Sequence, residues 1–133
     1  MATPFSTGAA TQNQWYPISD AEIVSTALNL FTQASGVLTS TKAGVFKVDW
    51  VVAVDSSIPS KHISVGASIN GAAPTYHQTR WISATSQETI IMGTRIVTLT
   101  AGQTISLQIR TTDSGTPALT CNHFSLNAVM IGG

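Results

Sequence analysis

A single run of alternating residues constrains the fold of this chain more than any other feature. From Gly44 to Val54 the sequence reads GVFKVDWVVAV, and every second residue from Phe46 to Val54 is large and apolar. Successive side chains of a β-strand point to opposite faces. A period of two held over this length therefore predicts a long strand with one face in a core.

The rest of the chain continues in short strands separated by turn residues. Asn70-Gly71 is a strong hairpin signal because both positions favour positive φ. We expect strands at 22–27, 28–33, 36–41, 44–54, 62–69, 76–83, 89–92, 94–100 and 105–110, and a last strand that starts at Ala118 or Asn122 and ends at Ile131. Residues 22–31 also show helical spacing, so their assignment as strands rests on the strands that follow. This succession predicts an all-β, antiparallel fold that is a β-sandwich or a jelly roll.

The charge of the chain is low and balanced. Charged residues make up 9% of the sequence, and the formal net charge is +0, whereas about 25% of residues are charged in ordinary soluble proteins. A chain without a basic excess lacks the positive patch that attracts nucleic acid or an anionic membrane, so we expect neither partner. The polar residues are mostly uncharged Thr and Ser. Such a surface gives little repulsion between molecules and favours a protein that works packed in an assembly.

The first 20 residues differ from the rest because they show neither a strand period nor a helical period. We assign residues 1–20 to an extended N-terminal arm and residues 21–133 to the jelly-roll domain. The arm carries Phe5, Trp15 and Tyr16, large contact residues that a disordered tail does not need. It is therefore expected to dock, either on its own domain or on a neighbouring subunit. The arm has no signal-peptide pattern, so synthesis in the cytoplasm is expected.

Candidate residues for chemistry are few. The histidines are His62, His77 and His123, and none has the spacing of a metal site. Cys121 is the only cysteine, and alternation would place it on the same face as His123, but nothing supplies the third group of a nucleophile pair. Asp55 and Asp113 offer carboxylates at loop ends for a calcium ion, as a minor alternative. We expect no enzyme activity, no metal and no cofactor.

Four short motifs follow one another along the chain: Gly44-Val45-Phe46, Asn70-Gly71, the turn from Leu99 to Gly102-Gln103, and Phe124-Ser125 at the last strand. In this order they resemble the trimeric jelly-roll family of the complement globular head and tumour necrosis factor. The resemblance covers residues 30–133 and implies a homotrimer of tumour-necrosis-factor-like sandwiches. Gln103 stands where the family usually has Asp, which puts in doubt the polar contact of that Asp.

Two strands are apolar on both faces, which is unexpected for strands that lie between one core and solvent. Opposite its core face the 44–54 strand carries Val45, Val51 and Ala53, and the last strand carries Val129 and Ile131. In the resembling family these two strands lie side by side near the threefold axis. We therefore predict that these five residues form a trimer interface. The alternative is that the arm covers them.

These features lead to the hypothesis of a structural virion protein of a bacteriophage, since viruses of bacteria use similar jelly rolls and the collagen-like repeats of animal members are missing. In this hypothesis the trimer decorates the capsid surface as a cement protein and bridges subunits of the major capsid protein. Phe5, Trp15 and Tyr16 would anchor the arm to the shell. The alternative is a receptor-binding tip or spike domain for host saccharide or protein. Its possible ligand patch is Tyr76, His77, Arg80 and Trp81, unless Trp81 packs in the core.

Overall fold

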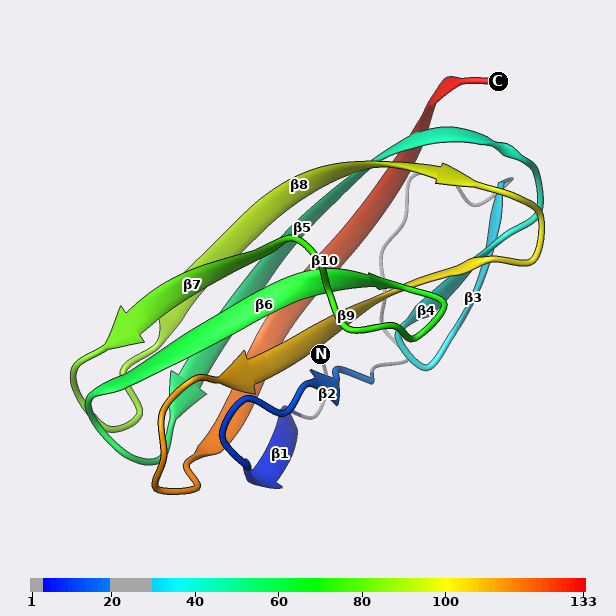
Figure 1. The fold of residues 1–133 in the computed structure, drawn as a ribbon. Helices are drawn as coiled ribbons and strands as arrows, with labels where there is room; N and C mark the ends of the chain where they lie inside the picture. The colour runs from blue at the N-terminus through cyan, green and yellow to red at the C-terminus, as the bar shows by residue number, and fades with distance from the viewer. Residues whose placement is uncertain (1–3, 20–29) are drawn as a thin grey trace.

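Two antiparallel sheets pack face to face in the computed structural model, which describes residues 4–19 and 30–133 (Figure 1). Sheet A has the order β1 (Phe5–Ala9), β10 (Ala118–Gly132), β5 (Gly44–Ser56) and β8 (Thr89–Leu99). Sheet B has the order β3 (Phe31–Ala34), β4 (Val37–Ser40), β9 (Thr104–Thr111), β6 (Lys61–Ile69) and β7 (His77–Ile82), and β2 (Tyr16–Pro17) also pairs with β9. The predicted all-β jelly roll is confirmed. Within the described residues no helix is long and apolar enough to span a bilayer.

The core lies between the two sheets and is built from the alternation that the sequence shows. On β5 the buried side chains are those of Phe46, Val48, Trp50, Val52 and Val54. Sheet B supplies the opposite wall with Ile63, Val65, Ala67, Ile105, Leu107 and Ile109, all at 0% exposure. The other face of β5 is the outer face of sheet A, which points away from this core.

β8 is one continuous strand of 11 residues, so the expectation of two strands divided at Gly93 is wrong. Gly93 pairs with Trp50, and a Cβ at Gly93 would overlap the indole ring of Trp50. The glycine is therefore required by the close approach of a large core side chain, and not by a turn.

β10 contains a bulge between Cys121 and His123, which changes the face on which His123 lies. Cys121 pairs with Val54 and is buried in the core, whereas His123 pairs with Ala53 and is exposed on the outer face. The expectation that these two side chains share a face is therefore wrong. A bulge adds one unpaired residue to a strand and inverts the alternation beyond it.

The described part of the arm docks on its own domain. β1 pairs with β10, where Phe5 lies opposite Cys121. β2 pairs with β9, and the Asn13 and Ile18 amides donate to the carbonyls of Thr111 and Leu107 at 2.8 and 2.9 Å. Phe5, Trp15 and Tyr16 are all half-buried. The arm thus contributes a strand to each sheet and runs across one side of the sandwich.

Two turns follow the sequence signals closely. Asn70 and Gly71 have φ of 55° and 78°, as the hairpin signal predicts, although the return strand begins only at His77. At the other turn the Gln103 side chain accepts a hydrogen bond from the Thr100 amide at 2.8 Å, so Gln103 itself closes the turn. The strand expected at 22–27, and the first residues of the one expected at 28–33, lie outside the described residues.

Candidate interaction surface

The outer face of sheet A consists of side chains in register across three strands. Pairing places His123, Ala53 and Ile90 in one row, and Ser125, Val51 and Met92 in the next. Toward the start of β5 follow a row of Asn127, Asp49 and Thr94, and then a row of Val129, Lys47 and Ile96. Val45 and Thr98 lie opposite each other at the end of the face, beside Gly132. The two strands that are apolar on both faces therefore lie side by side, as predicted.

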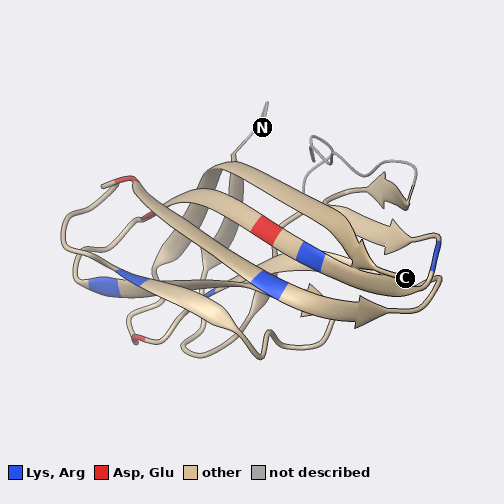
Figure 2. Cartoon of the chain, turned by 90° about the horizontal axis from the view of Figure 1, so that it is seen from above, with Lys and Arg blue, Asp and Glu red and all other residues tan. Residues whose placement is uncertain are grey.

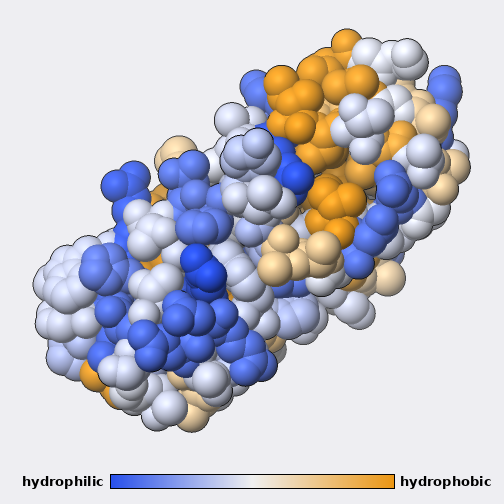
Figure 3. All heavy atoms as spheres, in the orientation of Figure 1, coloured by the Kyte–Doolittle hydropathy of each residue, from blue (hydrophilic) through white to orange (hydrophobic). Residues whose placement is uncertain are grey.

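This face carries most of the large apolar side chains that the described part of the chain exposes. Six of the eight exposed large hydrophobic residues lie on it: Val51 (42%), Ile90 (46%), Met92 (57%), Ile96 (65%), Val129 (45%) and Ile131 (53%). Figure 3 shows apolar side chains gathered at the end of the molecule where β8 ends and β5 begins. Large apolar patches on a soluble protein usually mark a binding surface. We call these six residues the apolar face.

The structure places all five predicted interface residues on this side of sheet A. Val51, Val129 and Ile131 are exposed, Val45 is half-buried, and Ala53 is 4% exposed. Residues 4–19 of the arm do not cover them, since β1 pairs with the edge of β10 that faces away from β5. We did not predict from the sequence that β8 contributes side chains to this apolar face. The signal was present in Ile90, Met92 and Ile96, but the assumed break at Gly93 hid their common face.

A polar row divides the apolar face. Thr94 donates to a carboxylate oxygen of Asp49 at 2.6 Å, and Asn127 Oδ1 is buried without a hydrogen-bond partner among the described residues. Lys47 lies between Val129 and Ile96 in the next row. Figure 2 shows how few charges interrupt these strands. A buried carbonyl oxygen without a donor costs free energy that a donor from another molecule would recover.

The apolar face also has a hollow at the end of the sheet where β5 ends and β8 begins. Val51, Ala53, Ile90 and His123 line it together with Glu88. Beside it the Asn122 amide donates to Asp55 at 2.9 Å and to Glu88 at 3.2 Å. The hollow therefore combines apolar side chains with a hydrogen-bonded carboxylate.

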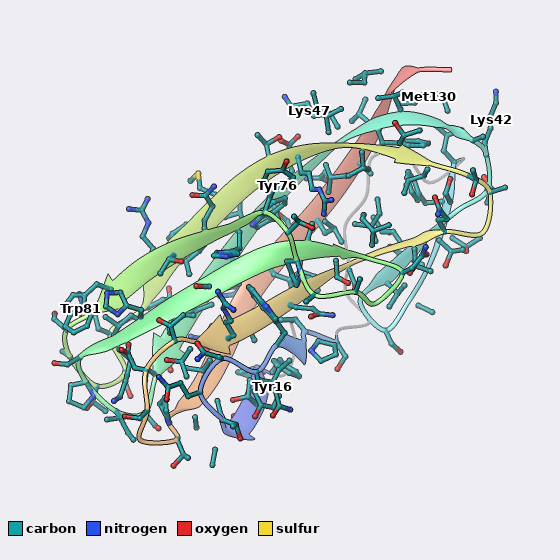
Figure 4. All side chains as sticks on the ribbon, viewed as in Figure 1. Tyr16, Lys42, Lys47, Tyr76, Trp81 and Met130 are labelled. Carbon is teal, nitrogen blue, oxygen red and sulfur yellow. The ribbon has the colours of Figure 1, made fainter. Side chains whose placement is uncertain are left out.

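The predicted ligand patch is divided by the alternation of β7. Trp81 is 50% exposed and its ring lies 4.6 Å from that of His62, so Trp81 does not pack in the core. Tyr76 lies toward the other end of the strand, where the Arg95 guanidinium sits 5.3 Å from the centre of its ring (Figure 4). Arg80 is exposed, and its β7 position alternates with that of Trp81. The four residues do not form one site.

His77, the fourth residue of that patch, contacts the arm. Its ring lies 5.4 Å from the ring of Trp15, and the Arg110 guanidinium lies 4.6 Å from the centre of the same Trp15 ring. A nitrogen of Arg110 is 3.4 Å from His77 Nε2. Burial, and then the positive charge of Arg110, lower the pKa of His77 below its usual range.

The two carboxylates considered for calcium have separate partners. Asp113 accepts from the His62 amide at 2.6 Å and lies 3.1 Å from His62 Nδ1, and these contacts lower the pKa of Asp113, the backbone hydrogen bond most of all. Asp55 instead pairs with Asn122. Within residues 4–19 and 30–133 no three His, Cys, Asp or Glu side chains form a group that could hold a metal ion.

Comparison with known proteins finds likeness only at the level of structure. No family model matches the chain, and no curated protein matches it in sequence. The globular domain of zebrafish complement 1qA protein is similar with a TM-score of 0.58 and 19% identity, over 96% of each chain. Eiger TNF from S. frugiperda is similar with a TM-score of 0.53 and 16% identity, over 97% of this chain and 84% of that one. At these identities the likeness establishes the shared jelly-roll fold.

Proposed function

We propose that this chain is a non-enzymatic structural protein that works as a homotrimer, with the apolar face of sheet A as its subunit interface. The observation that carries the proposal is the gathering of six exposed large apolar side chains on one face of the sandwich. Fully burying a Val, Ile or Met side chain contributes about 1.5–3 kcal/mol. Even partial burial of six such side chains therefore contributes more free energy of association than a single apolar contact on a protein surface.

A closed ring of three subunits needs two different surfaces on each subunit, because the contact is head-to-tail. The apolar face is one of them. The edge where β7 meets β8 is a suitable second surface, since Tyr76 is 64% exposed there and lines a hollow with Gln78 and Arg95. The polar row inside the apolar face would fix the register of the contact, because Asn127 Oδ1 is buried and has no donor among the described residues.

Sedimentation of the purified chain tests the assembly directly. The unchanged protein should sediment as a trimer, and Val51→Lys should sediment as a folded monomer because the charge lies in the middle of the interface. Thr85→Lys adds the same charge in the exposed loop between β7 and β8 and should leave the trimer intact. A monomeric unchanged protein would rule out the proposal.

The proposed role of the trimer is decoration of a bacteriophage capsid as a cement protein. The near absence of charge and the Thr- and Ser-rich surface support a protein made for an assembly. Each trimer would bridge subunits of the major capsid protein, and multivalent contact would raise the cost of separating them. Phe5, Trp15 and Tyr16 would reach the shell once the arm leaves its own domain.

Particles that contain the protein provide the test of this role. A cement protein should be present in a copy number comparable with that of the major capsid protein, whereas a fibre tip is present in few copies. Deletion of residues 1–17 should abolish capsid binding while sedimentation and circular dichroism still report a folded trimer. Undiminished capsid binding by such a trimer would exclude the arm as the anchor.

A receptor-binding tip is the second candidate function, and the exposed Trp81 favours it. The ring of Trp81 stands beside His62, which Asp113 holds in place by two contacts. A fixed, half-exposed indole with polar neighbours is a suitable platform for a saccharide ring. Trp81→Ala should then lose binding to host glycans or cells, whereas Tyr76→Ala should keep it. Equal binding by both variants would remove Trp81 from the function.

A further inference from the structure

The contact between the arm and sheet B brings together one ring of the arm and two basic side chains of the domain. Trp15 comes from the arm, Arg110 from β9 and His77 from the start of β7. The Arg110 guanidinium lies 4.6 Å from the centre of the Trp15 ring, and the His77 ring lies 5.4 Å from it at a tilt of 59°. The two basic groups are 3.4 Å apart, from Arg110 Nη2 to His77 Nε2.

We propose that Trp15, His77 and Arg110 form a pH-sensitive clasp, which holds the N-terminal arm on sheet B while His77 is neutral and loosens when His77 is protonated. A neutral imidazole can accept a hydrogen bond from Arg110 through Nε2. A protonated imidazole has no acceptor, so it would place a second cation against the guanidinium. The clasp is independent of the trimer and of the capsid role.

Among residues 4–19 and 30–133, no group beside His77 would neutralise this second charge. On β9 the charged group that faces it is Arg110, whose Nε is buried without a partner among the described residues. On β8 it is Arg95, which lines the same hollow as His77, and next to His77 in the chain stands the phenol of Tyr76. β6 places Gly66 opposite His77, and the described arm residues 4–19 carry no charged side chain. No carboxylate faces the imidazole from these elements.

The close packing around His77 limits how far its ring can move when the imidazole is protonated. A Cβ at Gly66 would lie 2.9 Å from the Cβ of His77 and 2.6 Å from the carbonyl oxygen of Tyr76, so β7 lies tightly on β6 at this point. His77 Nδ1 is buried without a hydrogen-bond partner among the described residues. Because the backbone of His77 is held in the sheet, the group that can move away is the guanidinium together with the indole that it covers.

The direction of the pH dependence follows from the lowered pKa of His77 in the docked state. Release of Trp15 would return the imidazole to water and let the guanidinium move away, so in this proposal the released state binds a proton more tightly than the docked state. Docking is then favoured at higher pH and weakens as the pH falls. The loss is complete once the pH is below the pKa of the docked state. Each unit by which docking lowers this pKa multiplies the opening equilibrium by about ten.

Hydrogen exchange of single backbone amides measures the clasp in the full chain. The reporter amides are those of Asn13 and Ile18, which donate to Thr111 and Leu107 across the contact. Exchange rates at pH 7.5 and pH 4.5 are corrected for the intrinsic effect of pH. The opening equilibrium of both reporters should rise by roughly threefold or more at the lower pH, while amides of the β5–β10 ladder keep their protection.

His77→Gln, which keeps an acceptor and cannot be protonated, should abolish this pH dependence. The matched control His123→Gln removes an exposed histidine of sheet A and should retain it. If His77→Gln does not fold, Arg110→Gln gives an independent readout, since the pKa of His77 followed by NMR should rise when the guanidinium is gone. Equal protection of both reporters at the two pH values, or the same loss in His77→Gln, would overturn the proposal.

Discussion

Gly93 of β8 lies directly opposite Trp50 of β5, and the indole of Trp50 occupies the space that a Cβ at position 93 would need. Trp50 is 2% exposed and is among the largest side chains in the core. Here β5 and β8 pair past the Trp50 indole because position 93 has no side chain. This pair fixes the course of β8 and with it the position of Ile90, Met92 and Ile96 on the outer face.

Gly93→Ala should destabilise the protein because the added methyl group overpacks a filled core. We expect the free energy of unfolding to fall by about 1–3 kcal/mol, measured by urea denaturation. Gly133→Ala is the matched control, since a Cβ there meets nothing within 4 Å, and it should change the stability by less than about 0.5 kcal/mol. A stable Gly93→Ala variant would show that the indole can move aside.

Arg95 ties the two sheets together at the edge between β7 and β8. Its guanidinium donates to the Ala67 carbonyl of β6 at 3.1 Å and lies over the ring of Tyr76. Arg95→Met should lower the free energy of unfolding by about 1–2 kcal/mol, and Tyr76→Phe, which keeps the ring, should have little effect. Arg80→Met removes an exposed arginine of β7 as the control. A double-mutant cycle with Tyr76→Ala that shows no coupling would contradict the ring contact.

The thiol of Cys121 should report whether β1 is docked. Cys121 is 0% exposed, and Phe5 of β1 pairs with it across the edge of sheet A. In the full chain the thiol should react with Ellman's reagent only slowly. Deletion of residues 1–9 should speed the reaction because it bares the edge of β10, whereas deletion of residues 1–3 alone should not. Equal rates for the two deletions would mean that β1 does not protect the thiol.

Asp113 should stabilise the fold at neutral pH and lose this effect in acid. Its pKa is lowered from 3.8, chiefly by the hydrogen bond from the His62 amide. Since the unfolded chain then binds the proton more tightly, the stabilisation is present above pH 3.8 and disappears as the pH falls through the lower pKa of the folded state. Asp113→Asn keeps an acceptor without the charge.

The unchanged protein should therefore unfold at a higher urea concentration than Asp113→Asn at pH 6, and the two midpoints should converge toward pH 2. The control is Asp55→Asn, which removes a carboxylate of sheet A that accepts a hydrogen bond from Asn122. A constant difference between the midpoints of the unchanged protein and Asp113→Asn at all pH values would contradict this role of the charge.

The sequence alone determined the strands and turns that depend on local rules. The alternation from Phe46 to Val54 defined the core face of β5, and Asn70-Gly71 defined a turn with positive φ. It also showed that two strands are apolar on both faces, because period two assigns each residue to a face whatever the partner strand is. The jelly-roll type was implied by the resemblance of the ordered motifs to a known family, and not by alternation itself.

The tertiary structure decided everything that depends on which strand lies next to which. The bulge after Cys121 is set by pairing with β5, and it alone separates Cys121 from His123. The continuity of β8 is set by the Trp50 indole, and the exposure of Trp81 by the position of β7 at a sheet edge. Alternation states that two side chains face opposite ways, but not which of them meets the core. That choice is made by long-range packing, so the full extent of the apolar face became visible only when β10, β5 and β8 were seen side by side.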